Sequence, residues 1–225
     1  MPRIARIVVS GIPHHVIQRG NRSQKVFFSD DDKELYLKIL SFICSKERVQ
    51  IWCYCLMDNH VHLIAVPERA DRMARAIGET HRKFTWTINA RNNWKGYLWQ
   101  GRFLSYPMDE TYLFRCVKYV ERNPVRAGLV KLAEEYQWSS ARAHVFGLRD
   151  PVLSPMPNVF QIGDWSAFLK GEEKDEDLEL LRRNQSIGRP LGSENFIEKL
   201  EKITGRCLKK RRPGRPKTKI EREER

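Results

Sequence analysis

The segment Val49-Gln-Ile-Trp-Cys-Tyr-Cys-Leu-Met-Asp-Asn-His-Val-His-Leu-Ile-Ala-Val66 contains two extended runs that meet at a turn. Residues 49–56 are β-branched, aromatic or apolar, residues 57–59 are Met-Asp-Asn, and residues 60–66 are again rich in valine and isoleucine. This order predicts a β-hairpin. Because side chains alternate along a strand, His60 and His62 would point to the same side of the sheet. Two imidazoles on one face can bind one metal ion, although histidine pairs in strands are often only structural.

The segments around this hairpin complete a βαββαβ order. Before the hairpin we expect a strand over residues 13–19, a turn over residues 20–22 and a helix over residues 29–47. After the hairpin we expect a helix over residues 72–90, a strand over residues 96–106 and a helix over residues 109–123. Ser29 and the three aspartates after it favour a helix start, since they supply a capping hydroxyl and negative charge at the positive end of the helix dipole. The order predicts an α+β, ferredoxin-like (split βαβ) antiparallel sheet, with helices on one face and the other face free for function.

Composition divides the chain into three regions, residues 1–148, 149–205 and 206–225. The first region is the expected folded domain, and prolines near residue 151 mark its end. The second is expected to be partly helical, and its acidic stretch 172–179 most simply forms a solvated helix face. The third contains ten Lys and Arg residues against three Glu, which predicts a flexible basic tail.

The net charge indicates the class of partner. The chain has 41 Lys and Arg residues against 28 Asp and Glu, a formal charge of +13. Such an excess favours a polyanion such as nucleic acid, although it could also serve only solubility. No apolar run is long enough to predict a membrane span, and we expect no membrane partner. Five cysteines without a Cys-x-x-Cys pair, and no sign of a signal peptide, predict free thiols in the cytoplasm.

Tyr119 and Asn123 are candidates for a site on the third helix. They are four residues apart and would share one helical face, close to the break expected at Pro124. Two imidazoles and an amide oxygen suit Mg²⁺ or Mn²⁺ better than a closed zinc site. Taken singly, Tyr119 is better interpreted as an ordinary half-buried aromatic residue and Asn123 as a helix C-terminal residue.

In combination these motifs resemble a known family. His60-Val-His62 after Met57-Asp-Asn, the run Tyr119-Val-Glu-Arg-Asn-Pro-Val-Arg-Ala-Gly-Leu-Val130, and Trp138-Ser-Ser140 resemble the single-tyrosine HUH transposases, and more closely their REP-associated branch. The resemblance runs from about Pro13 to Phe146. It implies His60 and His62 as metal ligands, Tyr119 as nucleophile, and Asn123 where related enzymes commonly carry a longer glutamine ligand.

The same resemblance implies a substrate and an assembly. Single-stranded DNA that carries a palindromic hairpin would be cut to a 5′-phosphotyrosine and a free 3′-hydroxyl, in the bacterial cytoplasm at the nucleoid. Related insertion-sequence enzymes complete their sites across a dimer, so monomer and homodimer both remain open. A hairpin DNA or RNA binding protein that does not cleave, and a phosphodiesterase that uses water, are the two alternatives.

Basic residues near the site and in the tail are the expected DNA contacts. They are Arg19, Asn21, Arg22, Arg82, Lys83, Lys95, Arg102, Lys118, Arg122, Arg126, Lys209, Lys210, Arg211, Arg212 and Arg215. Residues 81–106 mix such groups with aromatic side chains, which can stack on unpaired bases, but we expect most of these aromatics to be core. Residues 209–217 resemble an AT-hook interrupted by Pro213, for which nonspecific phosphate attraction is the simpler interpretation.

Overall fold

A four-stranded antiparallel sheet forms the centre of the protein. The structure, a computed structural model, describes residues 6–157 and 162–209, without the side chain of Ser186. The strands are β1 (His14–Arg19), β2 (Val49–Met57), β3 (His60–Pro67) and β4 (Leu104–Pro107), in the order β2-β3-β1-β4. All three neighbouring pairs are antiparallel. This is the strand order of a ferredoxin-like sheet, so the predicted fold class is confirmed.

Helices connect and follow the strands. They are α1 (Asp30–Lys46), α2 (Ala70–Asn92), α3 (Glu110–Glu121), α4 (Asn123–Arg126), α5 (Ala141–Phe146), α6 (Trp165–Lys170), α7 (Asp175–Ile187) and α8 (Glu194–Thr204), with 3-10 turns η1 (Asn21–Ser23) and η2 (Ala133–Glu135). The start of α1 follows the expected chemistry, because the Asp32 carboxylate accepts a hydrogen bond from the Ser29 backbone N–H at 3.2 Å.

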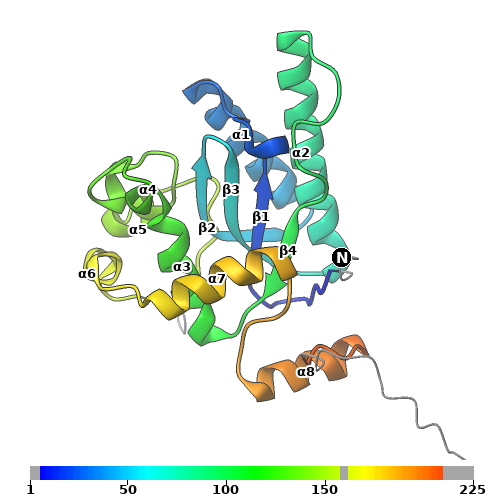
Figure 1. Cartoon of the computed structure of the whole chain (residues 1–225), viewed down its shortest axis with the longest axis vertical. Coiled ribbons are helices and arrows are strands. Elements are labelled where there is room, and N and C mark those ends of the chain that lie inside the picture. The colour runs from blue at the N-terminus through cyan, green and yellow to red at the C-terminus, as the bar shows by residue number, and fades with distance from the viewer. Residues whose placement is uncertain (1–5, 158–161, 210–225) are drawn as a thin grey trace, which may run out of the picture.

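The two faces of the sheet carry separate cores. On one face, α1 and α2 pack over Val16, Leu63 and Ala65. On the other, α3 and α7 pack over Ile17 and Ile64. Figure 1 shows α7 crossing in front of the sheet. The expectation that the second face would be uncovered is therefore corrected. The extension after the first domain supplies apolar side chains that close this face, and a bridge between Met108 and Leu191 ties it to the end of β4.

The remaining apolar contacts involve the N-terminal segment and buried thiols. Helix α8 lies apart from the sheet (Figure 1), where it packs on Ile7 and Val9. Cys53 and Cys55 are free, as expected, and are buried like small apolar residues. Among the described residues, no helix is long and apolar enough to cross a membrane.

Candidate active site

His60 and His62 lie on the face of the sheet that α3 and α7 cover. Their rings are 4.9 Å apart between centroids, as expected for alternate residues of one strand. His62 is fully buried, whereas His60 is half-buried at the end of the hairpin. Arg19 at the end of β1 is the register partner of His60, and Ile17 is the partner of His62.

Hydrogen bonds around Asn59 fix the proton position on His60. The Asn59 amide nitrogen donates to the Ser23 carbonyl at 3.1 Å, so the amide oxygen faces the His60 ring. That oxygen lies 2.6 Å from His60 Nδ1 and can only accept. His60 therefore carries its proton on Nδ1 and has a lone pair on Nε2, the arrangement that a metal-binding histidine needs.

His62 belongs to a buried chain of three polar side chains. Its Nδ1 lies 2.9 Å from Nε2 of His15, and Nδ1 of His15 lies 2.7 Å from the Tyr106 hydroxyl. The remaining ring nitrogen of His62, Nε2, is buried and has no hydrogen-bond partner among the described residues. A buried polar atom without a partner is costly, so such an atom calls for an explanation. A metal ion bound to Nε2 would provide one.

Burial keeps these imidazoles neutral. Desolvation lowers the pKa of His60 to about 4 and that of His62 well below its usual value, and in both cases nearby positive charge adds to the effect. A neutral imidazole is the form that binds a metal. Among the described residues, no cluster of three or more His, Cys, Asp and Glu side chains suits a metal ion. A metal ion held by the two histidines would therefore need its other ligands from groups such as an amide oxygen, water or substrate oxygens.

Tyr119 lies next to this pair. Its ring centroid is 5.8 Å from that of His62 and 6.3 Å from that of His15. The hydroxyl accepts a hydrogen bond from the Gln185 amide of α7 at 2.9 Å, and the ring is only 6% exposed. The guanidinium of Arg126 sits 4.1 Å from the ring centroid and also donates to the Tyr119 carbonyl. The fold therefore brings together the tyrosine and the histidines that the sequence singled out.

Asn123 occupies a different local setting from the one expected. We expected Tyr119 and Asn123 on one helix, but α3 ends at Glu121 and the one-turn helix α4 begins at Asn123. Pro124 explains the break, because it has no N–H to continue the helical hydrogen bonds. The Asn123 carbonyl accepts from Ala127 N–H at 3.0 Å. The role of its side chain as a third ligand stays a prediction.

Three of the predicted DNA contacts are already paired with the acidic stretch. Glu173 makes ion pairs with Arg122 at 3.3 Å and with Arg126 at 3.0 Å. Lys118 donates to the Glu172 carbonyl, and Asp177 pairs with Arg115. The interpretation of residues 172–179 as a purely solvated face is thus wrong for Glu173 and Asp177. Their carboxylates pair with arginines in or beside α3 and α4.

Other predicted contacts form an exposed surface next to the site. The backbone of Asn21 donates to the Leu98 carbonyl, and that of Gln100 donates to the Arg19 carbonyl. The loop 93–103 therefore lies beside the end of β1 that carries Arg19. A groove of about 640 Å³ is lined there by Arg82, Arg102 and exposed aromatic side chains. Lys95 lines a neighbouring groove of about 420 Å³.

The aromatic residues of this surface divide into two groups. Phe84, Trp99 and Phe103 are buried, as expected. Trp86, Trp94 and Tyr97 are 72%, 48% and 88% exposed, but because Tyr106 is buried as well, four of the seven rings in residues 81–106 are core, as expected.

The remaining predicted contacts lie elsewhere. Arg22 is exposed in η1. Arg82 is paired with Glu79, Lys83 lies over Phe42, and Lys209 is paired with Glu198. Lys210, Arg211, Arg212 and Arg215 are outside the described residues.

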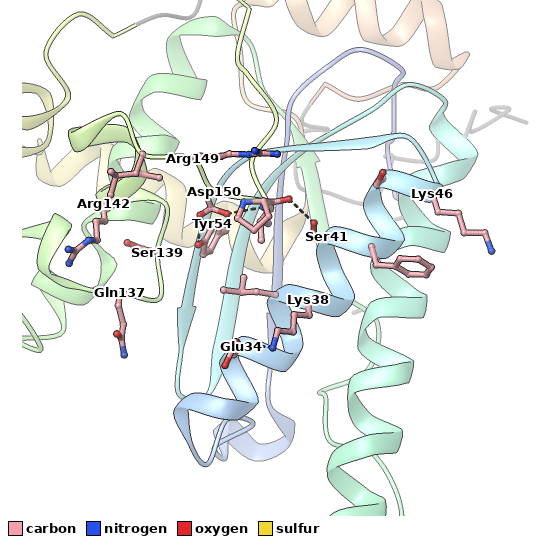
Figure 2. A pocket seen from close by; sticks show the side chains of 17 residues that line it. Glu34, Lys38, Ser41, Lys46, Tyr54, Gln137, Ser139, Arg142, Arg149 and Asp150 are labelled. Atoms are coloured by element: carbon pink, nitrogen blue, oxygen red, sulfur yellow. Dashed lines mark hydrogen bonds and ion pairs between the residues drawn. The ribbon is translucent and has the colours of Figure 1, made fainter.

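A larger cavity lies on the other side of the sheet. It has a volume of about 900 Å³ and is formed by α1 and residues 137–152 (Figure 2). Tyr54 donates to Asp150 at 2.7 Å within it. None of the predicted site residues lines this cavity, so its size does not indicate the active site.

Sequence reasoning missed four residues that shape the site: Asn59, His15, Tyr106 and Gln185. Asn59 was visible in the hairpin motif, and a polar residue directly before a candidate ligand was the available signal. His15 stands in the first predicted strand, where its spacing from Ile17 and Arg19 places it on the site's face. No local pattern marks Tyr106 or Gln185, because their partners are distant in the sequence.

The chain belongs to the IS200-like transposase family. Residues 8–123, just over half of its 225 residues, match the family described as "Transposase IS200 like". The matched range contains both histidines, Tyr119 and Asn123. The predicted family resemblance is thereby confirmed. No curated protein matches the chain.

Two solved structures are similar to the chain. The structure of a REP-associated tyrosine transposase bound to a REP hairpin is 21% identical with a TM-score of 0.56, and the alignment covers 77% of this chain and 99% of that one. A protein of Deinococcus radiodurans R1, described as a candidate transposase, is 19% identical with a TM-score of 0.38, over 54% and 97% of the two chains. The first likeness is one of fold, and it agrees with the strand order described above.

Proposed function

We propose that this protein is a metal-dependent endonuclease and strand transferase for single-stranded DNA, acting beside hairpins of the REP type through a 5′-phosphotyrosine. One observation carries the proposal: Tyr119 lies 5.8 Å, between ring centroids, from a buried, neutral His62 whose Nε2 lacks a partner. A nucleophile beside a metal-ready imidazole is the combination that phosphoryl transfer requires.

The reaction balances without an external energy source. The Tyr119 hydroxyl oxygen forms a bond to phosphorus, the bond from phosphorus to the 3′ oxygen breaks, and the phenolic proton is transferred in net to the leaving 3′ oxygen. A second 3′-hydroxyl reverses the exchange and rejoins DNA, since the phosphodiester energy is kept in the tyrosine ester. A divalent cation, Mg²⁺ or Mn²⁺, held by His60, His62 and Asn123, would polarise the phosphate.

The residues around Tyr119 prepare it for this role. Arg126 over its ring supplies positive charge where the phosphate would arrive, and Arg19 lies at the opposite edge beside His60. The Gln185 hydrogen bond and Glu173 must give way before DNA reaches the hydroxyl. Their displacement by a phosphate is favourable in charge, because DNA would replace one carboxylate at Arg122 and Arg126.

The exposed surface beside β1 suits the unpaired DNA that leads away from the site. Trp86 and Tyr97 are far more exposed than aromatic side chains usually are, and Arg102 and Lys95 accompany them. Rings of this kind stack on bases while cations follow the backbone, independently of sequence. We propose that the single-stranded flank passes Arg19 and continues over this surface.

The direct test uses the full chain, a panel of hairpin-bearing single strands, and Mn²⁺. We expect a covalent protein–DNA adduct that is lost in Tyr119→Phe and in EDTA. Tyr112→Phe is the matched control, because Tyr112 is the other tyrosine of α3 and its ring lies against Arg115, at 5.2 Å from the guanidinium. Cleavage that survives Tyr119→Phe without an adduct would instead indicate a phosphodiesterase that uses water.

A second function, hairpin binding without cleavage, is favoured by the covered state of Tyr119. The ring is 6% exposed and its hydroxyl is held by Gln185. If this is the protein's activity, hairpin binding is tight and salt-dependent, unchanged by EDTA or Tyr119→Phe, and no hairpin of the panel is cut.

A further inference from the structure

His15 is a buried histidine that the proposed chemistry does not use directly. It is fully buried on β1, its ring stacks on that of His62 at 5.0 Å between centroids, and it connects His62 to Tyr106 through both of its ring nitrogens. Its two hydrogen-bond partners are 47 and 91 positions away in the sequence and lie on the two strands that pair with β1.

The protons of this chain can be arranged in two ways. In the first, Tyr106 donates to His15 Nδ1 and His15 Nε2 donates to His62 Nδ1, so His62 must carry its proton on Nε2. In the second, His62 Nδ1 donates to His15 Nε2 and His15 Nδ1 donates to the Tyr106 oxygen. All three groups stay neutral in both arrangements. Only the second leaves a lone pair on His62 Nε2, the atom without a partner.

We propose that His15, supported by Tyr106, is the positioning residue that accepts the His62 Nδ1 proton and so presents His62 Nε2 as a metal ligand. The proposal rests on the proposed metal site. The comparison with His60 supports it, because Asn59 accepts the Nδ1 proton of His60 in the same way at 2.6 Å. Each candidate ligand thus has its own acceptor, one supplied by the adjacent residue and the other by a neighbouring strand.

Burial gives the His15 contact its importance. His60 is half-buried, and water could replace Asn59 as the acceptor of its proton. His62 is fully buried, so without His15 its Nδ1–H would have no acceptor, and the ring could relieve this cost by turning or by moving its proton to Nε2. Either change would remove the lone pair that a metal needs.

Metal binding by the full-length protein without DNA tests this directly. Free Mn²⁺ is followed by electron paramagnetic resonance during a titration. We expect His15→Leu to weaken Mn²⁺ binding by about 10- to 100-fold, the usual range for the loss of a residue that orients a metal ligand. His15→Gln, whose amide oxygen can still accept the proton, should recover most of the affinity. Tyr106→Phe should cause a smaller loss than His15→Leu.

His14→Leu is the matched control. His14 is equally buried and adjacent in sequence, but it accepts from Val9 N–H at 3.2 Å and does not contact His62. The midpoint temperature of thermal unfolding should fall in both leucine variants, whereas the affinity for Mn²⁺ should fall only in His15→Leu. Equal losses of Mn²⁺ affinity in the two would overturn the proposal, as would no recovery in His15→Gln. If His15→Leu does not fold, the other two variants test the proposal: His15→Gln should keep most of the Mn²⁺ affinity, and Tyr106→Phe should lose part of it.

His62→Ala separates this inference from the proposed function. Binding lost in His62→Ala but unchanged in His15→Leu would overturn the role of His15 alone. If the protein without any substitution binds no Mn²⁺, this result overturns the proposed metal site and also the role of His15.

Discussion

Each face of the sheet buries a histidine beside a tyrosine hydroxyl. The two pairs differ because only one of them leads on to a buried ring nitrogen that has no hydrogen-bond partner among the described residues. On the α1 and α2 face, His81 Nε2 lies 3.0 Å from the Tyr36 hydroxyl, and the His81 ring stacks close to Trp99. On the α3 and α7 face, the corresponding pair is His15 and Tyr106, and its chain ends at the unpartnered Nε2 of His62.

We interpret the difference as that between a structural polar pair and a pair that belongs to the proposed site. The Tyr36 and His81 pair lies within an aromatic cluster with Phe27 and Phe84, and its one neighbour without a partner among the described residues is the indole N–H of Trp99, which is a donor only. The second pair leads to an imidazole nitrogen that has no partner among the described residues and can bind a metal. Buried polar groups stabilise a fold when they are fully paired, and an incomplete one points to a ligand.

The largest expected effect comes from removing a member of each face. His62→Ala should lower Mn²⁺-dependent adduct formation by more than about 100-fold, because it removes a metal ligand. His81→Ala should keep adduct formation and lower the free energy of unfolding by about 2–4 kcal/mol, since it opens a cavity and leaves Tyr36 unpaired. Urea unfolding and the adduct assay measure the two quantities. Equal effects of both variants on adduct formation would break the comparison.

Two aromatic residues of α2 sharpen the contrast between packing and binding. Phe84→Ala should lower the free energy of unfolding by about 3–5 kcal/mol, because its ring is fully buried. Trp86→Ala should leave stability unchanged and weaken single-stranded DNA binding by about 1–3 kcal/mol, the usual contribution of a stacked base. Fluorescence anisotropy with labelled DNA provides the measurement. Unchanged DNA affinity in Trp86→Ala would remove this surface from the proposed DNA path.

Acid should destabilise the protein through its buried histidines. Burial lowers the pKa of His81 to about 3, whereas in the unfolded chain it is near 6.5. Below pH 6.5 the unfolded state therefore binds more protons, so the free energy of unfolding decreases as the pH falls from about 6.5 towards 3. His81→Gln keeps a partner for Tyr36 and should flatten this dependence. Urea unfolding between pH 7 and pH 4 tests the sign, and a stability that rises on acidification would contradict it.

The smallest expected effect concerns the acidic stretch. Glu173→Gln should release Arg122 and Arg126 and steepen the salt dependence of DNA binding by about one to two phosphate contacts. Glu176→Gln removes the same charge from an exposed position of α7 and serves as the control. Plots of the logarithm of affinity against that of salt concentration give the slopes. Identical slopes for both variants would mean that Glu173 acts only through net charge.

Sequence reasoning recovered the parts of the fold that local patterns encode. The alternation in residues 60–66 placed both histidines on one face, and Ser29 with its aspartates marked the start of α1 within a residue. It missed the cover provided by α7, because an acidic helix with few apolar residues reads as solvated until its partners are known. Glu173 is half-buried against Arg122, which lies between α3 and α4, and Arg126 of α4, and no periodicity in residues 172–179 predicts these contacts.

The sequence predicted that His60, His62 and Tyr119 would be candidate site residues, but it did not predict the residues that contact them. His60, His62 and Tyr119 stand in motifs, whereas the contacts of His15 to Tyr106 and of Tyr119 to Gln185 span 91 and 66 residues. Pairings of that kind depend on strand order and on helix docking. The break after Glu121 was expected at Pro124, but the short helix that follows it was not.

The chain of hydrogen bonds from His62 through His15 to Tyr106 also has a consequence for synthesis and folding. It crosses three neighbouring strands, β3, β1 and β4, and β4 is made about 40 residues after β3. A nascent chain can form the β2–β3 hairpin early, because its contacts are local. It cannot complete the support of His62 until β4 has joined the edge of the sheet, and Tyr119 follows later still. A partly synthesised chain therefore displays the histidine motif without the ability to cut DNA.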